Sequence, residues 1–208
     1  SSGKAAFVQL AFYGGYFSMA LPAALFIRKY NYKTAILIGL GLYATGALMF
    51  FPAANYGIFG FFLVSLYILT FGLAFLETTA NPFILAMGSN ETATRRLNLA
   101  QSFNPLGSIT GMLIAKNFIL ARLHAGDNFS SLPEAEKTAI RAHDLVIIRN
   151  PYVVLGLVVI AVFIIFAVYK MPSFKNREKS LGFKESISTL FNNKIYVEGV
   201  IAQVFYVA

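Results

Sequence analysis

A long stretch of this chain is almost free of charge. Between Thr34 and Ala93 it has two charged residues, Glu77 and Glu91, and Glu91 lies in a polar break. The apolar run from Tyr56 to Met87 is long enough to cross about 30 Å of hydrocarbon as a helix. Such a stretch is typical of an integral membrane protein.

Composition supports this interpretation and excludes other classes. Of the 208 residues, 57% are hydrophobic and 12% are charged, whereas soluble domains are about 25% charged. Backbone groups in lipid must pair within their own helix, so we expect an all-α membrane protein. We expect the apolar spans at roughly residues 5–27, 34–52, 56–87, 97–121 and 145–169, with a sixth that begins near Tyr196. The net charge of +8 comes from clusters beside these spans, so we expect no nucleic-acid partner.

The basic clusters predict a topology. Arg28, Lys29 and Lys33 follow the first span, and Arg95 and Arg96 follow the third. The Ala-Ala-Asn break after the second span has no charge, and the break after the fourth is net acidic. Every second connection is therefore expected to be cytoplasmic, and the first span to run from outside to inside. We expect a helix before it and further helices after residue 208, in a protein about twice as long.

Two longer breaks have structure of their own. Ser131-Leu132-Pro133-Glu134 resembles a capping box and predicts a small surface helix. Residues 170–195 are expected to form a basic cytoplasmic linker. Phe183, Ile187, Leu190 and Phe191 recur there at helical spacing, which predicts an amphipathic helix on the membrane surface. The expected domains are then 1–169, a transmembrane half; 170–195, the linker; and 196–208, the start of a second half.

Glu77 is the residue most in need of an explanation, because a carboxylate at the bilayer centre costs about 3 kcal/mol. Asn81 lies four residues on, on the same helical face, and Pro82 is expected to bend the helix. The next span carries Asn98, Gln101 and Asn104 on one face, followed by Pro105. At 1.5 Å per residue, Glu77, Asn81, Gln101 and Asn104 fall roughly 9–15 Å from the same membrane face.

Amides donate and accept hydrogen bonds and a carboxylate accepts several, which suits a sugar. A carboxyl group in an apolar environment can also hold a proton at neutral pH, so Glu77 could couple sugar binding to proton movement. Five aromatic residues could pack against a sugar ring: Tyr13, Tyr16, Phe75, Phe83 and Phe103. The alternatives are that Glu77 is structural and that the amides join helices. His124 and His143 have no further ligand at a metal-binding spacing, so we expect no metal site.

Two strings carry a resemblance. They are LETTANPF, which contains Glu77, and RRLNLAQSFNPLGS, which begins at Arg95. In these two segments the chain resembles the fucose permease family of sugar–proton symporters, within the major facilitator superfamily. The segments AFYGGYF and PAALFIRKYNYKTAILIGLGLY resemble its second and third helices, and AQVFYVA resembles the start of its seventh.

The resemblance implies a major facilitator fold of twelve helices, of which this chain would hold helices two to six and the start of seven. It implies uptake of L-fucose or a related hexose with a proton by alternating access. Glu77, Gln101 and Asn104 would bind sugar, with Glu77 also coupling the proton, and Arg28, Lys29 and Lys33 would form a cytoplasmic gating loop. Pro105 stands where the family pattern suggests a small polar residue.

We therefore expect a monomeric hexose–proton symporter of the bacterial inner membrane, with Glu77, Asn81, Gln101 and Asn104 binding substrate. Its only coupling ion would be the proton, with no cofactor or metal. The alternative is a passive facilitator or channel in which Glu77 is structural. An enzyme is not expected, because no second catalytic partner is found within the spans.

Overall fold

The computed structural model describes residues 2–123, 132–170 and 183–207. The chain divides into two compact units, Ser1–Phe174 and Lys175–Ala208, and each is described by itself. In the described ranges the regular structure is helical, which confirms the predicted all-α class.

The first unit contains nine helical segments within its described residues. In chain order they are α1 Ser2–Lys29, α2 Tyr32–Leu48, α3 Phe50–Tyr56, α4 Phe59–Ala86, the 3-10 turn η1 Asn90–Thr92, α5 Ala93–Gln101, α6 Phe103–Ile114, the π-helical segment η2 Ala115–Leu120 and α7 Glu134–Val168. Four stretches are long and apolar enough to cross a membrane: Gly3–Ile27, Tyr32–Tyr56, Phe59–Ala86 and Glu134–Val168.

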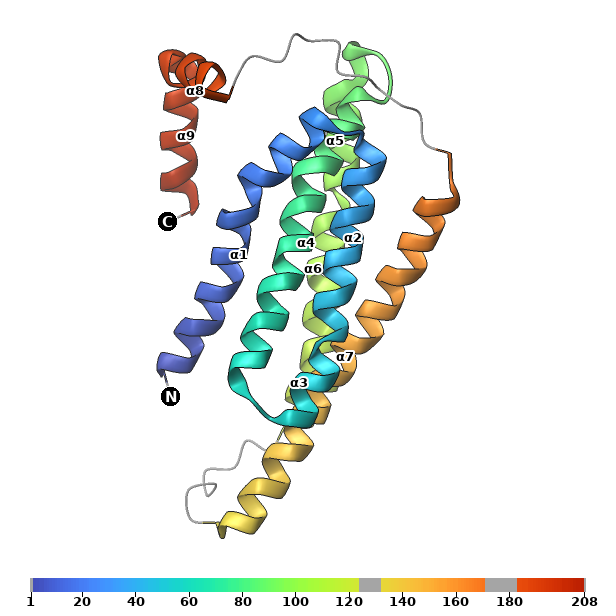
Figure 1. Ribbon diagram of the computed structural model, residues 1–208, viewed down its shortest axis with the longest axis vertical. Helices are drawn as coiled ribbons and strands as arrows, with labels where there is room; N and C mark the ends of the chain where they lie inside the picture. The colour runs from blue at the N-terminus through green and yellow to red at the C-terminus, as the bar shows by residue number, and fades with distance from the viewer. Residues whose placement is uncertain (1, 124–131, 171–182, 208) are drawn as a thin grey trace. The chain divides into compact units, whose positions relative to one another are not determined.

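The core of this unit lies along α2 and α4. The α4 helix packs against α1 and α2, and α2 packs in turn against α7 (Figure 1). Three small apolar clusters occur along these contacts. They are Ala23, Ala35 and Phe75; Ile36, Leu40 and Phe83; and Ala47, Phe50 and Leu69.

Two predicted boundaries are wrong. The Ala-Ala-Asn segment was expected to separate two spans, but it lies inside α3. The chain turns instead at Gly57, whose φ of +64° is a left-handed conformation that glycine adopts without a steric penalty. The predicted small surface helix is not separate either, because α7 runs without interruption from Glu134 through the fifth apolar span. Its proposed cap, Ser131, lies outside the described residues.

The predicted span 97–121 is a succession of α5, α6 and η2. The helix is interrupted at Ser102, between α5 and α6, although the Ser102 N–H still donates to the Asn98 carbonyl at 2.9 Å. Pro105 accounts for this, because it has no N–H to donate to the Gln101 carbonyl and its ring crowds that carbonyl. Pro82, by contrast, lies inside an unbroken α4.

The second unit contains α8, Phe183–Asn192, and α9, Lys194–Val207, which contact each other. The α8 helix lies where the amphipathic helix was expected, and Leu190 and Phe191 are exposed. The side chains of Phe183 and Ile187 lie outside the described residues, as does most of the linker, so its cytoplasmic placement stays a prediction.

Candidate functional site

The α4 helix has one buried face and one open face. Leu69, Thr79 and Phe83 are buried, whereas Glu77 is exposed and Asn81, one turn further on, is half-buried. Glu77 and Asn81 therefore share the open face, as their spacing predicts.

Tyr16 of α1 is the neighbour of Glu77 across the helix pair. Its half-buried phenol lies beside the Glu77 carboxylate, where it can donate a hydrogen bond to that group. A hydroxyl donor stabilises an ionised carboxylate and fixes its orientation. The Phe12 ring lies 5.4 Å from that of Tyr16 between centroids and supports it.

The other four aromatic candidates have different surroundings. Phe75 and Phe83 are buried at 5% and 8% exposure and pack in the apolar clusters, which makes them core residues. Tyr13 and Phe103 are 66% and 64% exposed. Among the five, Tyr16 is the residue that the structure brings to Glu77.

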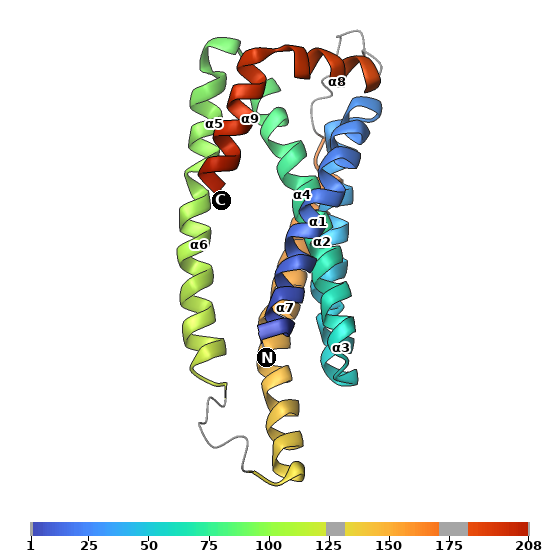
Figure 2. The ribbon, with the colours of Figure 1, turned by 90° about the vertical axis from the view of Figure 1, so that its left-hand side faces the viewer.

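Gln101 and Asn104 lie on either side of the break at Ser102, and both are exposed. The α4 and α5 helices form a hairpin through η1 and contact each other near it. Figure 2 shows α4 and α6 diverging with distance from this hairpin. Within the described part of the chain, no hydrogen bond joins Gln101 or Asn104 to Glu77 or Asn81. The structure thus places the two pairs on facing arms of one hairpin without direct contact.

The buried hydroxyls of α4 are already satisfied. Ser65, Thr70 and Thr79 each donate to the carbonyl four residues earlier, at 2.8, 2.8 and 2.6 Å. Hydroxyls bonded in this way stay within their own helix. The groups on α4 that remain open to a ligand are therefore Glu77 and Asn81.

The predicted gating residues are partly helical. The backbone of Arg28 and Lys29 belongs to the last turn of α1, so the connection to α2 is shorter than expected, and their side chains lie outside the described residues. Lys33 donates hydrogen bonds of 2.8 Å to the carbonyls of Ala167 and Tyr169 at the end of α7. It ties the start of α2 to that end, where a cation is electrostatically favoured.

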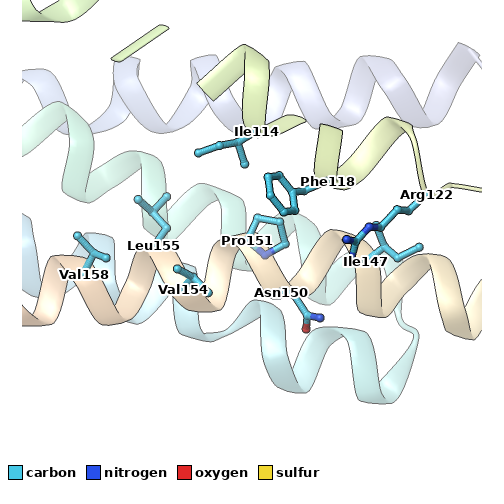
Figure 3. A pocket seen from close by; sticks show the side chains of 9 residues that line it. All are labelled: Ile114, Phe118, Arg122, Ile147, Asn150, Pro151, Val154, Leu155 and Val158. Atoms are coloured by element: carbon cyan, nitrogen blue, oxygen red, sulfur yellow. The ribbon is translucent and has the colours of Figure 1, made fainter. Parts of the chain in front are cut away.

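Two cavities of this unit lie away from the four predicted residues. One, of about 470 Å³, lies between α7 and the α6–η2 segment, and Figure 3 shows Phe118 extending there toward Pro151. Its wall is mostly aliphatic, which does not suit a hexose. The other, of about 490 Å³, is lined by Gln9, Tyr13, Tyr43, Tyr152 and neighbouring apolar residues. Across the described residues, no cluster of three or more acidic or histidine side chains could hold a metal, and the expectation of no metal stays a prediction.

Long apolar helices around an open carboxylate, with amides on the adjoining hairpin arm, define a multi-pass membrane protein of the carrier type. The family model described as "Major Facilitator Superfamily" matches residues 1–208, and the chain belongs to this superfamily. It is 61% identical to the L-fucose-proton symporter of Haemophilus influenzae, over 99% of this chain and 50% of that protein. It is 34% identical to a glucose/galactose transporter of Brucella abortus, over 86% of this chain and 40% of that protein.

A solved structure agrees with these similarities. The crystal structure of a variant of the Escherichia coli fucose:proton symporter FucP matches with a TM-score of 0.84 at 32% identity, over 96% of this chain and 50% of that one. The chain spans about half the length of these relatives. The predicted resemblance to the fucose permease family is confirmed. The relatives named here are transporters, in agreement with the prediction that the chain is not part of an enzyme.

Proposed function

We propose that the protein to which this chain belongs imports a hexose-type sugar, L-fucose or a close relative, together with a proton by alternating access. The observation that carries the proposal is the placement of Glu77 on the open face of α4, beside Tyr16 and one turn from Asn81. The named activities of the Haemophilus and Escherichia relatives support it.

The residues divide the work as follows. Glu77 accepts hydroxyl hydrogen bonds from the sugar when ionised, and carries the coupling proton when neutral. Asn81, Gln101 and Asn104 supply amides that donate to and accept from sugar hydroxyls. The proton is the only coupling ion, and no metal or organic cofactor takes part. The protein acts as a monomer in the bacterial inner membrane, and Lys33, with Arg28 and Lys29, belongs to the cytoplasmic gate.

The coupling role predicts the behaviour of Glu77→Gln in full-length protein reconstituted in vesicles. Gradient-driven sugar accumulation should be lost, because glutamine cannot exchange a proton, while sugar counterflow should persist. Glu91→Gln is the matched control, because Glu91 is an exposed carboxylate in the hairpin turn. The measurement is uptake across a hexose panel with and without a proton gradient. Accumulation unchanged by Glu77→Gln would assign Glu77 a structural role and favour a passive facilitator.

The amides give a second prediction. Gln101→Ala and Asn104→Ala should each raise the sugar KM roughly tenfold, since a hydrogen bond to a ligand is worth about 1–1.5 kcal/mol. Ser102 lies between them, and Ser102→Ala is the control, because the Ser102 hydroxyl already donates to the Leu99 carbonyl of α5 at 2.7 Å. Unaltered KM in both amide variants would contradict a sugar-binding role.

A further inference from the structure

Arg96 spans the turn between the two arms of the site. From the first turns of α5, its Nε donates to the Ile84 carbonyl at 3.3 Å, and its Nη2 donates to the Leu85 carbonyl at 3.0 Å. Its Nη1 donates to the Ser89 carbonyl at 3.1 Å and to the Thr92 hydroxyl. One guanidinium thus binds the last turn of α4, the connecting segment and η1 together.

The end of α4 explains why a hydrogen-bond donor with positive charge is stabilising at this place. The last carbonyls of a helix have no partner within the helix, and they carry partial negative charge. Ile84 and Leu85 are among these positions, and the Ile84 carbonyl also accepts from the N–H of the cap residue Met87 at 3.3 Å. Arginine suits them because its planar fork donates in several fixed directions, whereas lysine offers a single ammonium group.

Gly88 makes room for this arrangement. A Cβ at this position would lie 2.9 Å from Nη1 of Arg96, and the φ of Gly88 is +144°, which other residues rarely adopt. The glycine and the arginine therefore belong to one unit, which we call the Arg96 staple: Arg96 with Ile84, Leu85, Gly88 and Thr92.

The staple is a common reference point for both arms of the candidate site. On α4, Asn81 and Glu77 lie about 5 and 11 Å along the helix axis from Ile84. On the other arm, Gln101 and Asn104 lie about 8 and 12 Å from Arg96 at the same rise per residue. The α5 helix contacts α4 near the hairpin turn, and the α5–α6–η2 arm contacts α7 through η2, at the end of the arm away from that turn. The position of α5 along α4 therefore depends mainly on the contacts at the hairpin turn.

We propose that Arg96 is a positioning residue for sugar binding. By tying α5 to the end of α4, it sets the depth at which Gln101 and Asn104 face Glu77 and Asn81. This inference rests on the proposed sugar-transport function, because it assigns a supporting residue to the same site.

The test compares Arg96→Ala with Arg95→Ala in the full-length protein. Arg95 is the matched control, because it is the adjacent cation, is exposed, and its side chain makes no hydrogen bond to the described part of the chain. Arg96→Ala should raise the sugar KM roughly tenfold while the maximal counterflow rate per folded transporter changes less, since each sugar hydrogen bond lost from a misplaced amide costs about 1–1.5 kcal/mol. Arg96→Lys should lie between, and Gly88→Ala should reproduce the effect with Arg96 still present. Arg95→Ala should leave KM unchanged.

A distance measurement makes the test independent of transport. The chain contains no cysteine, so spin labels at Val64→Cys on α4 and Leu113→Cys on α6, both exposed here, report the separation of the arms. Arg96→Ala should broaden or shift this distance, and Arg95→Ala should not. An unchanged distance, or a changed distance with unchanged KM, would overturn the positioning role. Failure of the unmodified protein to take up any sugar would overturn the proposed function instead, and the distances would still decide whether the staple fixes the arms.

Discussion

The Glu77 carboxylate lies beside the Tyr16 phenol of the neighbouring helix, and this contact restricts the orientation of both side chains. Tyr16 is placed to donate a hydrogen bond to Glu77, and such a bond favours one orientation of the carboxylate. A sugar hydroxyl that binds Glu77 then meets an acceptor that is already held in place. Preorganisation of this kind reduces the entropy that binding must lose.

Tyr16→Phe should therefore raise the sugar KM. The ring and its contact with Phe12 are kept, and only the hydroxyl is lost. A hydrogen bond to a charged group contributes about 1.5 kcal/mol, so the expected change is roughly tenfold. Tyr13→Phe is the control, because Tyr13 is exposed on the same helix. Equal KM values in the two variants, measured by sugar uptake, would show that the Tyr16 hydroxyl plays no part.

Single residues show where sequence patterns suffice and where they fail. Spacing alone places Glu77 and Asn81 on one face. It does not separate Tyr16 from Phe75 and Phe83, because α4 is apolar all round and carries no amphipathic signal. Whether one of these aromatic side chains lies at Glu77 or in the core depends on which helix packs beside α4. Local periodicity does not predict that helix pairing.

Between elements, the closest approach is that of α2 and α4. A Cβ added to Gly72 would lie 2.3 Å from the Tyr43 backbone nitrogen, and one added to Gly46 would lie 2.3 Å from that of Leu69. Small residues at such crossings are the usual way for membrane helices to pack, because backbones can then approach closely. By contrast, Gly107 and Gly111, a GxxxG pair in sequence, have no atom within 4 Å of an added Cβ within the structure described here.

Gly46→Ala and Gly72→Ala should each destabilise the protein. The added methyl group meets backbone atoms that cannot rotate away, and overpacking costs about 1–3 kcal/mol. The expected fall in Tm is about 5 °C, measured on full-length protein in detergent. Gly60→Ala is the matched control on α4, because an added Cβ there has open space. A Tm for Gly72→Ala equal to that of Gly60→Ala would refute the close crossing.

Element boundaries follow local chemistry that hydropathy does not resolve. Apolar runs predict where the long helices lie, but the turn at Gly57 and the interruption at Ser102 depend on one glycine and one proline. Pro82 and Pro105 are equivalent in sequence, yet α4 continues through the first and the helix is interrupted three residues before the second. The α4 helix packs against α1 and α2, and this tertiary context, which local sequence does not contain, differs from that of the segment around Pro105.

At the scale of the whole molecule, the alternation of charge in the connections is the main guide to orientation. Arg95 and Arg96 lie in α5 at the α4–α5 hairpin. Between residues 124 and 144, by contrast, the acidic residues Asp127, Glu134, Glu136 and Asp144 outnumber Lys137 and Arg141. With 35 residues, α7 is about 52 Å long, well beyond the roughly 30 Å of hydrocarbon. Its first turns, which carry Glu134 and Glu136, therefore extend into water.

This geometry predicts opposite accessibility for two exposed acidic positions, Glu91 in η1 and Glu136 in α7. If basic connections face the cytoplasm, a cysteine at position 136 should react with a membrane-impermeant thiol reagent in intact cells. A cysteine at position 91 should react only after the cells are opened. The full-length protein without other cysteines is the background for both variants. Reversed labelling would invert the topology, and it would place the Arg96 hairpin and the Lys33 contact on the outer face, where a cytoplasmic gate could not operate.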